Sequence, residues 1–270
     1  AANIAIDYNI QGPSFTVSTA CSSGGDAINT ACMCMQSGKA DIMLAVGAES
    51  VLCPLVIYSL ANAKALSRRN DSPSTASRPF DVTRDGFVIG EGGGALVLET
   101  EEHALARGAK IYAEIRGCGN TDDAYHVTAP HPEGRGAIAC MKQAIAEAGI
   151  NPSDIGYINA HGTATNKGDT VETSSIKKVF GNTLPYVSST KGATGHMMGA
   201  GGITETITCV KAIETGTVPP TINLNEVDPE CAGIDFVANT AKKAEINFAM
   251  SNAFGFGGQN SSIIVGKYGK

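Results

Sequence analysis

A cysteine and two histidines are the residues of this sequence whose placement could support nucleophilic catalysis. Cys21 stands where a short alternating run, residues 15–18, which predicts a strand, gives way to a helical pattern that ends near Gly38. A thiol at the start of a helix faces free backbone N–H groups, and these dipoles favour the nucleophilic thiolate. The small neighbours of Cys21 leave room for a substrate. A buried structural cysteine is the alternative at this point.

Each histidine follows a predicted strand. His161 comes directly after the strand expected at 156–160, and His196 begins the long helix expected at 196–214. Ligands bind at the carboxyl ends of strands in open α/β sheets, so both rings and Cys21 are expected to share one sheet edge. A helix N-terminus lowers the pKa of a histidine, so His196 is expected to be a neutral imidazole that donates one hydrogen bond. A structural role is the alternative for each histidine taken alone.

Composition favours a reduced, cytoplasmic α/β protein. The 270 residues are 43% hydrophobic and 17% charged, and 32 of them are glycine. The net charge of −6 argues against nucleic-acid binding, and no apolar run reaches the length of a membrane span. The eight cysteines lie mostly in apolar runs, as reduced thiols do, and their spacing matches no zinc knuckle. Neither a nucleic-acid partner nor membrane insertion is expected.

The hydrophobic pattern predicts one α/β series that occurs twice. The second occurrence has the order β-α-β-α-β-α-β-β, with strands expected at 111–115, 156–160, 186–189, 234–237 and 261–265 and helices at 136–149, 169–180 and 196–214. Residues 12–99 predict β-α-β-β, in which the strand at 41–46 should pair in parallel with 15–18. This order matches the last four elements of the series in the second occurrence.

Weak similarity between residues 17–25 and 187–195 supports an internal duplication. We therefore expect a first half at 1–108, which holds the nucleophile, and a second half at 109–270, which holds both histidines. The first copy lacks a leading βαβα, so the chain is expected to be an N-terminally truncated piece of a longer protein. We further expect the isolated chain 1–270 to be poorly active or unstable.

Several ordered motifs carry a resemblance to a known family. They are Thr19-Ala-Cys-Ser-Ser-Gly24, His161-Gly-Thr-Ala-Thr-x-x-Gly-Asp169, Lys191-Gly-Ala-Thr-Gly-His196, Asn252-Ala-Phe-Gly-Phe-Gly-Gly258 and the turn-rich segment 78–92. Over essentially its whole length the chain resembles the β-ketoacyl-[acyl-carrier-protein] synthases, most closely the elongating, synthase II-like type. The resemblance implies a thiolase-like fold with α-β-α-β-α layers, built from a duplicated βαβαβαββ unit, and a homodimer.

This resemblance implies a decarboxylating condensation that elongates fatty acyl chains by two carbons. Cys21 takes an acyl group from acyl-carrier protein, and His161 and His196 stabilise the enolate formed when malonyl-carrier protein loses carbon dioxide. Backbone N–H groups of Cys21 and Phe256 hold the later oxyanion. No metal and no redox cofactor is implied, because the substrates arrive on the phosphopantetheine of the carrier protein.

The resemblance also suggests roles for further residues. Lys191 acts electrostatically, paired with Glu205, with a surface lysine as the alternative. Asp169, like Glu172, has the spacing of a helix cap, and capping is as good an explanation as catalysis. Candidates along the substrate path are Thr163 and Thr165 for phosphopantetheine, Phe254 and Phe256 as a gate or core aromatics, Leu60 at the acyl pocket, and Thr128 and His126. A carrier-protein patch is expected at Lys64, Arg68 and Arg69, with a solvated loop as the alternative.

Related activities are distinguished by single residues. A thiolase would carry a second cysteine in place of His196, and a synthase that uses acyl-CoA would carry asparagine in place of one histidine. A chain-length partner subunit would lack Cys21. A polyketide ketosynthase shares the motifs and stays open, as does an inactive fragment of such an enzyme. A Cys/His/His site would instead bind zinc stoichiometrically. A bacterial cytoplasm or an organelle is the expected compartment.

Overall fold

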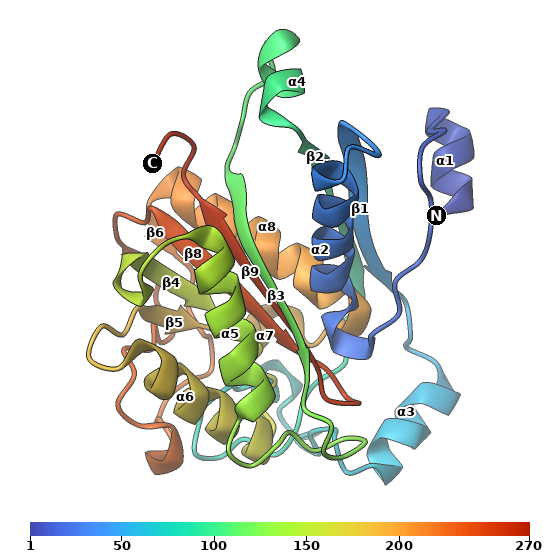
Figure 1. Ribbon diagram of the computed structural model, residues 1–270. Coiled ribbons are helices and arrows are strands. Elements are labelled where there is room, and N and C mark those ends of the chain that lie inside the picture. The colour runs from blue at the N-terminus through green and yellow to red at the C-terminus, as the bar shows by residue number, and fades with distance from the viewer.

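Layers of helix and sheet alternate in the structure, a computed structural model that describes residues 1–270 (Figure 1). Two helices form an outer layer, two form a middle layer, and one sheet lies on each side of the middle layer. The helices are α5 (Arg135–Ala148) and α6 (Asn166–Phe180) outside, and α2 (Ser23–Gln36) and α8 (Gly201–Thr215) in the middle. These are four of the five layers predicted in the order α-β-α-β-α.

A mixed five-stranded sheet separates α5 and α6 from α8. Its strands, in spatial order, are β3 (Glu114–Asp122), β9 (Gln259–Gly266), β8 (Phe248–Phe254), β4 (Ile155–Asn159) and β5 (Tyr186–Ser188). Strands β8, β4 and β5 run parallel, whereas β9 is antiparallel to both β8 and β3. The chain therefore leaves β4, β5 and β8 at one common edge of the sheet.

The first half contributes a small sheet on the other side of the middle layer. Strands β1 (Ile42–Glu49) and β2 (Gly92–Glu99) pair antiparallel there and pack on α2 and α8. In each half a helix thus precedes an antiparallel strand pair: α2 precedes β1 and β2, and α8 precedes β8 and β9.

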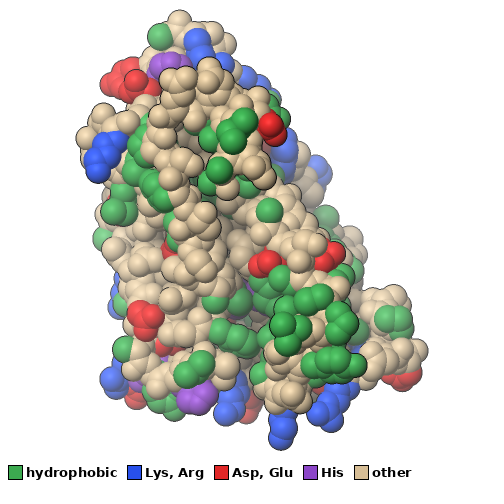
Figure 2. Space-filling view, turned by 90° about the vertical axis from the view of Figure 1, so that its right-hand side faces the viewer, with side chains coloured by type: hydrophobic (Ala, Val, Ile, Leu, Met, Phe, Trp, Pro, Cys, Tyr) green, Lys and Arg blue, Asp and Glu red, His purple; other side chains and the backbone are tan.

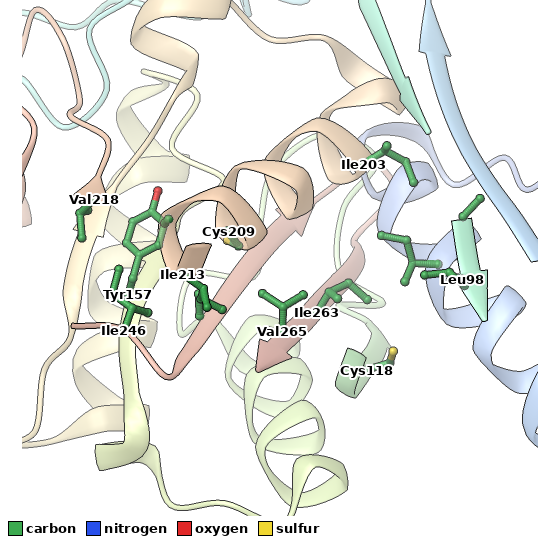
Figure 3. Close-up of a cluster of buried hydrophobic side chains, with 14 of the residues drawn as sticks. Leu98, Cys118, Tyr157, Ile203, Cys209, Ile213, Val218, Ile246, Ile263 and Val265 are labelled. Atoms are coloured by element: carbon green, nitrogen blue, oxygen red, sulfur yellow. The ribbon is translucent and has the colours of Figure 1, made fainter. Parts of the chain in front are cut away.

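Side chains of alternate strand residues build the two hydrophobic cores. On β9, Ile263 and Val265 point toward α8, whereas Ile264 faces the opposite core under α5 and α6. Figure 3 shows Ile263 and Val265 beside Ile213 and Cys209 of α8, with Tyr157 of β4 at the far end of the cluster. Apolar burial on both faces makes the sheet a rigid support for the loops at its edge.

Short elements complete the chain. They are α1 (Ala2–Tyr8), α3 (Pro54–Asn62), α4 (Glu101–Ala106), α7 (Lys191–Thr194), β6 (Thr217–Val218) and β7 (Lys242–Lys243). Helix α3 exposes Leu55 and Tyr58, and hydrophobic side chains gather low on the face shown in Figure 2, the side on which α3 lies. None of the helices combines the length and the apolar character needed to cross a bilayer.

Two strand predictions in the first half are wrong. Residues 15–18 form no strand, because no neighbouring strand lies beside them to supply hydrogen bonds. The expected parallel pairing with 41–46 is consequently absent, and β1 pairs antiparallel with β2. In the second half, the strand expected at 111–115 starts later, at Glu114, and continues to Asp122 along β9.

Two further predictions near the C-terminus need correction. Residues 234–237 make only isolated bridges, and the strand beside β9 is β8, which sequence patterning missed. The helix expected at 196–214 starts later: a 3-10 turn at Met198–Ala200 comes first, and α8 begins only at Gly201. Met198 has a positive φ of +42°, which interrupts a right-handed helix at this position.

Candidate active site

A strained turn and a close helix crossing position Cys21. The residue lies in a single 3-10 turn, Ala20–Ser22, that leads into α2, and Ala20 has the positive φ of +51°. Helix α2 crosses α8 almost backbone to backbone, because a Cβ added at Gly24 would lie 2.7 Å from the backbone nitrogen of Ile203. The start of α2 is therefore held directly against the start of α8.

The three predicted side chains converge, although only His161 and His196 follow strands and Cys21 does not. The Cys21 sulfur and one ring nitrogen from each of His161 and His196 all lie within 4.8 Å of one another. His196 Nε2 is 3.1 Å from Cys21 Sγ, and the two imidazoles meet edge to face with centroids 5.2 Å apart. The nucleophile comes from the first half of the chain and both imidazoles come from the second.

His196 is held by a neighbouring extended segment rather than by a helix start. Its backbone N–H donates to Val88 O (2.7 Å) and its carbonyl accepts from Gly90 N (2.9 Å). The prediction that His196 begins a helix is therefore wrong, although the residue does follow β5 and lies at the expected edge. Phe87 packs edge-on against its ring, with centroids 5.2 Å apart.

Both imidazoles are neutral at pH 7. Burial lowers the pKa of each ring well below its usual value, and the nearby Lys191 ammonium lowers it further. The neutral state of His196 was predicted, but its cause is burial and a cation rather than a helix dipole. Nδ1 of His196 is buried without a partner, whereas Nε2 faces the sulfur, so a proton on Nε2 is the better satisfied tautomer.

Cys21 rests as a thiol in this site. Burial raises its pKa to about 11, despite hydrogen bonds to the sulfur from the backbone N–H groups of Phe256 and of Cys21 itself. The prediction that the helix start favours the thiolate is wrong for this state, because the cost of burying an anion exceeds the gain from these dipoles. The same two N–H groups both lie close to the sulfur.

Two buried carboxylates fix the loop that carries His161. Glu172 accepts hydrogen bonds from the backbone N–H groups of His161 and Gly162, both at 2.8 Å. Asp169 accepts from Phe80 N (2.7 Å) and Ala164 N (3.2 Å). The capping prediction is wrong, since α6 begins at Asn166 and both carboxylates reach other loops. Burial raises the pKa of Asp169 to about 7 and that of Glu172 to about 6.

Lys191 and Glu205 form the predicted ion pair, and both side chains are almost fully buried. The pair joins α7 to α8. Burial raises the pKa of Glu205, and the Lys191 ammonium opposes that rise. A surface lysine is thereby excluded, and the positive charge of Lys191 is the one that acts on both histidines.

A cavity of about 280 Å³ opens onto the three side chains. Six predicted residues line it together with the converging side chains: Leu60, Thr128, Thr163, Thr165, Phe254 and Phe256. His126 does not; its Nδ1 accepts hydrogen bonds from the backbone of Thr128 and Ala129. Sequence reasoning missed Phe87 and Glu49, which also line the cavity. Phe87 lies within the motif at 78–92 that carried the resemblance.

The predicted carrier-protein patch lies on the loop after α3. Lys64 and Arg68 are exposed, whereas Arg69 is partly buried and donates from Nη2 to Thr83 O at 3.0 Å. The same loop pairs with Phe87, whose carbonyl accepts from Ser67 N at 3.0 Å. Through Phe87 the basic loop is attached to the wall of the cavity.

The site also offers a donor set for a metal ion. One thiol and two imidazoles within 4.8 Å could supply three of the four ligands of tetrahedral zinc, once the thiol loses its proton. The nearby Lys191 ammonium, which lowers the pKa of both histidines, opposes a second cation there.

Two family models match the chain. The beta-ketoacyl synthase N-terminal domain matches residues 1–104, and the beta-ketoacyl synthase C-terminal domain matches residues 112–225. The chain is 48% identical to a 3-oxoacyl-[acyl-carrier-protein] synthase 2 of Rhizobium meliloti over 99% of its own length. It is 45% identical to a chloroplastic 3-oxoacyl-[acyl-carrier-protein] synthase II of Arabidopsis thaliana, of which it covers 50%. The chain spans 64% of the length of the Rhizobium relative.

Solved structures share the fold. A ketosynthase in complex with its type II PKS acyl-carrier protein superposes with a TM-score of 0.96 at 38% identity, over 99% of this chain and 66% of that one. A beta-ketoacyl synthase from Burkholderia phymatum gives a TM-score of 0.95 at 39% identity, over 99% of this chain and 64% of that one. The predicted thiolase-like fold is thereby confirmed.

Proposed function

The chain belongs to the β-ketoacyl synthase family, and on this premise we propose that its site condenses malonyl-acyl-carrier protein with an acyl group held on Cys21, with loss of carbon dioxide. One observation carries the proposal: a thiol and two neutral imidazoles lie within 4.8 Å of one another in a cavity. A thiol supplies the acyl carrier, and neutral imidazoles supply hydrogen-bond donors for an enolate.

Acyl transfer to Cys21 is the first step. The sulfur attacks the thioester carbonyl of the acyl-carrier protein, a Cys21 thioester forms, and the carrier thiol leaves with the proton that Cys21 gives up. The N–H groups of Phe256 and Cys21, which already point at the sulfur, stabilise the negatively charged oxygen of the tetrahedral intermediate. Because the resting pKa is about 11, deprotonation accompanies substrate arrival rather than preceding it.

Condensation follows at the same place. His161 and His196 donate hydrogen bonds to the thioester oxygen of the malonyl group, so that breaking its bond to the carboxylate leaves carbon dioxide and a stabilised enolate. The enolate carbon attacks the acyl carbonyl on Cys21, the bond to sulfur breaks, and the product leaves on the carrier two carbons longer. No step requires a metal or redox cofactor, so dialysis against a chelator should leave turnover unchanged. Stoichiometric zinc binding with loss of turnover on chelation would favour a metal site instead.

Mass spectrometry after incubation with acyl-carrier protein tests the proposal. We expect an acyl adduct on the peptide that contains Cys21 and its release when malonyl-carrier protein is added. The variant Cys21→Ser serves as the control, because a serine at this site keeps the shape of the turn and lacks the thiol. Absence of any adduct on Cys21, with the carrier substrates intact, would reject the assignment.

We place the acyl-carrier protein on the loop that carries Lys64 and Arg68. The exposed positive charges suit an acidic carrier, and Phe87 connects this loop to the cavity wall. Arg68→Glu should raise KM for carrier-bound substrate and leave turnover of a pantetheine thioester unchanged. Equal effects on both substrates would remove this loop from the docking surface.

Assembly and compartment are further parts of the proposal. Exposed Leu55 and Tyr58 on α3 are consistent with a homodimer, which light scattering of the purified protein tests directly. Relatives named as chloroplastic and mitochondrial synthases stand beside bacterial ones, so we propose a bacterial cytoplasm or an organelle interior.

A polyketide ketosynthase is the second candidate, favoured by the likeness to the type II PKS ketosynthase. Both activities use the same condensation. They differ in whether the β-keto group of the product is reduced before the next round of elongation. Products from a fully reduced acyl substrate and from a β-ketoacyl substrate distinguish the two. Preference for the reduced substrate supports fatty-acid elongation, and preference for the keto substrate supports the second candidate.

A further inference from the structure

Asp26 is a buried carboxylate one turn into α2, and only 4% of its surface is exposed. Its hydrogen-bonding partners are hydroxyl and amide groups rather than a base. Oδ2 accepts from Thr19 Oγ1 and from Ser22 Oγ (2.8 Å), and Oδ1 accepts from Asn120 Nδ2 at 2.6 Å. Burying a carboxylate is costly, so three donors converging on one acid mark a specific role for it.

The two hydroxyls held by Asp26 lie on either side of the nucleophile. Thr19 precedes Ala20, the residue with positive φ, and Ser22 follows Cys21. A positive φ at a non-glycine residue costs free energy and persists only where the surroundings impose it. The bonds from Thr19 and Ser22 to one carboxylate therefore fasten both ends of the strained turn.

The third bond reaches the other half of the chain. Asn120 lies on β3, which pairs with β9, and β9 in turn pairs with β8, the strand that leads to Phe256. A single carboxylate thus connects the turn that presents the sulfur with the sheet that presents the second N–H group at that sulfur.

We infer that Asp26 is a positioning residue: it holds the Cys21 turn in register with the Phe256 N–H, and so controls acyl transfer rather than decarboxylation. The inference rests on the proposed function. The donors for the malonyl enolate, His161 and His196, are held by Glu172 and by the backbone of residues 88–90, with no bond to Asp26. Loss of Asp26 should therefore separate the two half-reactions.

The test measures both half-reactions in one set of variants. Asp26→Ala should slow acylation of Cys21 by about 100-fold, the scale on which small displacements of reacting groups act, and leave malonyl decarboxylation within about threefold. Asp26→Asn, which keeps one acceptor oxygen, should fall between Asp26→Ala and the wild type. Asp41→Ala, an exposed aspartate at the start of β1, is the matched control. An equal loss in both half-reactions, or a loss in neither, would overturn the inference.

Hydrogen exchange keeps the inference testable apart from the proposed function. Amides of residues 19–23 should exchange at least about tenfold faster in Asp26→Ala, with protection of β8 and β9 unchanged. If Asp26→Ala fails to fold, Asn120→Ala removes one of the three bonds and should shift the same two readouts by less. Because the chain spans 64% of the Rhizobium relative, activity is measured on a protein extended by the part of the relatives that this chain does not cover. An extended protein that neither acylates nor decarboxylates rejects the proposed function, whereas unchanged exchange at 19–23 rejects the role of Asp26.

Discussion

The Lys191 ammonium bonds to the Glu205 carboxylate with both groups shielded from water, and the positive charge of Lys191 acts on both imidazoles of the site. Such a pair is a costly element of a core, and breaking it by removing one partner costs more than replacing both. Its position explains why a cation can act on His161 and His196 without contacting substrate: Lys191 lowers the pKa of each ring.

Replacing both members of this pair should shift the loss of malonyl decarboxylation at low pH to a higher pH. In Lys191→Met/Glu205→Gln the nearby positive charge is gone, so the pKa of each imidazole rises. Malonyl decarboxylation should then fall at a higher pH than in the wild type. The measurement is the rate of carbon dioxide release between pH 4.5 and 8, and loss at an unchanged pH would contradict the electrostatic role. Glu205→Gln alone keeps the Lys191 cation, so it should not raise the pH at which decarboxylation is lost.

Alkylation of Cys21 should report its raised pKa. With a pKa of about 11, the thiolate fraction grows about tenfold for each pH unit up to that value, so the iodoacetamide rate should rise through pH 10 without a plateau. Peptide mass spectrometry follows Cys21 separately from the other thiols, with Cys21→Ser to confirm the peptide. A plateau below pH 8 would mean that the resting site already holds a thiolate.

Glu172 should make stability depend on pH. Its pKa in the folded protein is about 6 against a usual value of 4.5, so the folded state binds the proton more tightly. The free energy of unfolding should consequently decrease as pH rises from 4.5 to 6, by about 1.3 kcal/mol from this group. Urea unfolding of the wild type and Glu172→Gln at both pH values measures the slope. The Glu172 charge also helps to raise the pKa of Asp169, so Glu172→Gln should reduce the contribution of Asp169 in the same direction. Identical slopes in the two proteins would rule out Glu172 as a source.

Crowding at Gly255 should damage acyl transfer. A Cβ there would lie 3.1 Å from Thr19 O and 3.2 Å from Cys21 N, so Gly255→Ala must push the Phe256 loop away from the nucleophile. We expect acylation to fall about 10- to 100-fold while decarboxylation changes little. Gly12→Ala is the control, because a Cβ at Gly12 has no atom within 4 Å. If Gly255→Ala is acylated as fast as the control, the Phe256 loop and the Cys21 turn are not held rigidly against each other.

Side-chain volume at Leu60 should set acyl length. Leu60 lines the cavity, so Leu60→Phe removes space and should favour shorter acyl substrates, whereas Leu60→Ala adds space for longer ones. Competition between acyl-carrier proteins of two chain lengths gives the ratio of kcat/KM directly. Both variants should keep the wild-type rate of malonyl decarboxylation, and an unchanged ratio in both would place the end of the acyl chain elsewhere.

Sequence patterning located the chemistry better than the fold. His161 and His196 were placed correctly because each follows a strand, β4 and β5, and strand ends are marked locally in the sequence. Cys21 was found from its place at the start of the helical pattern of α2. The prediction of a strand at 15–18 was wrong because a strand forms only beside another strand that supplies hydrogen bonds, and sequence periodicity does not show whether such a neighbour exists. Strand β8 was missed for a related reason: residues 248–254 are buried on both faces and show no alternation.

Electrostatics could not be predicted from sequence spacing. The helix start predicted a thiolate at Cys21, but whether burial or a dipole controls a pKa depends on how completely later segments cover the group. Glu172 likewise has the spacing of a capping residue, and its two bonds to the loop of His161 become visible only in three dimensions.

Helices α2 and α8 meet where glycines leave no side chain between them, since a Cβ at Gly202 would lie 2.3 Å from Gly25 N. The distance between the start of α2, which carries Cys21, and the start of α8 is therefore set by backbone contact and not by the packing of side chains. A larger residue at Gly24, Gly25 or Gly202 would therefore push α2 away from α8 and move Cys21 relative to the second half of the chain.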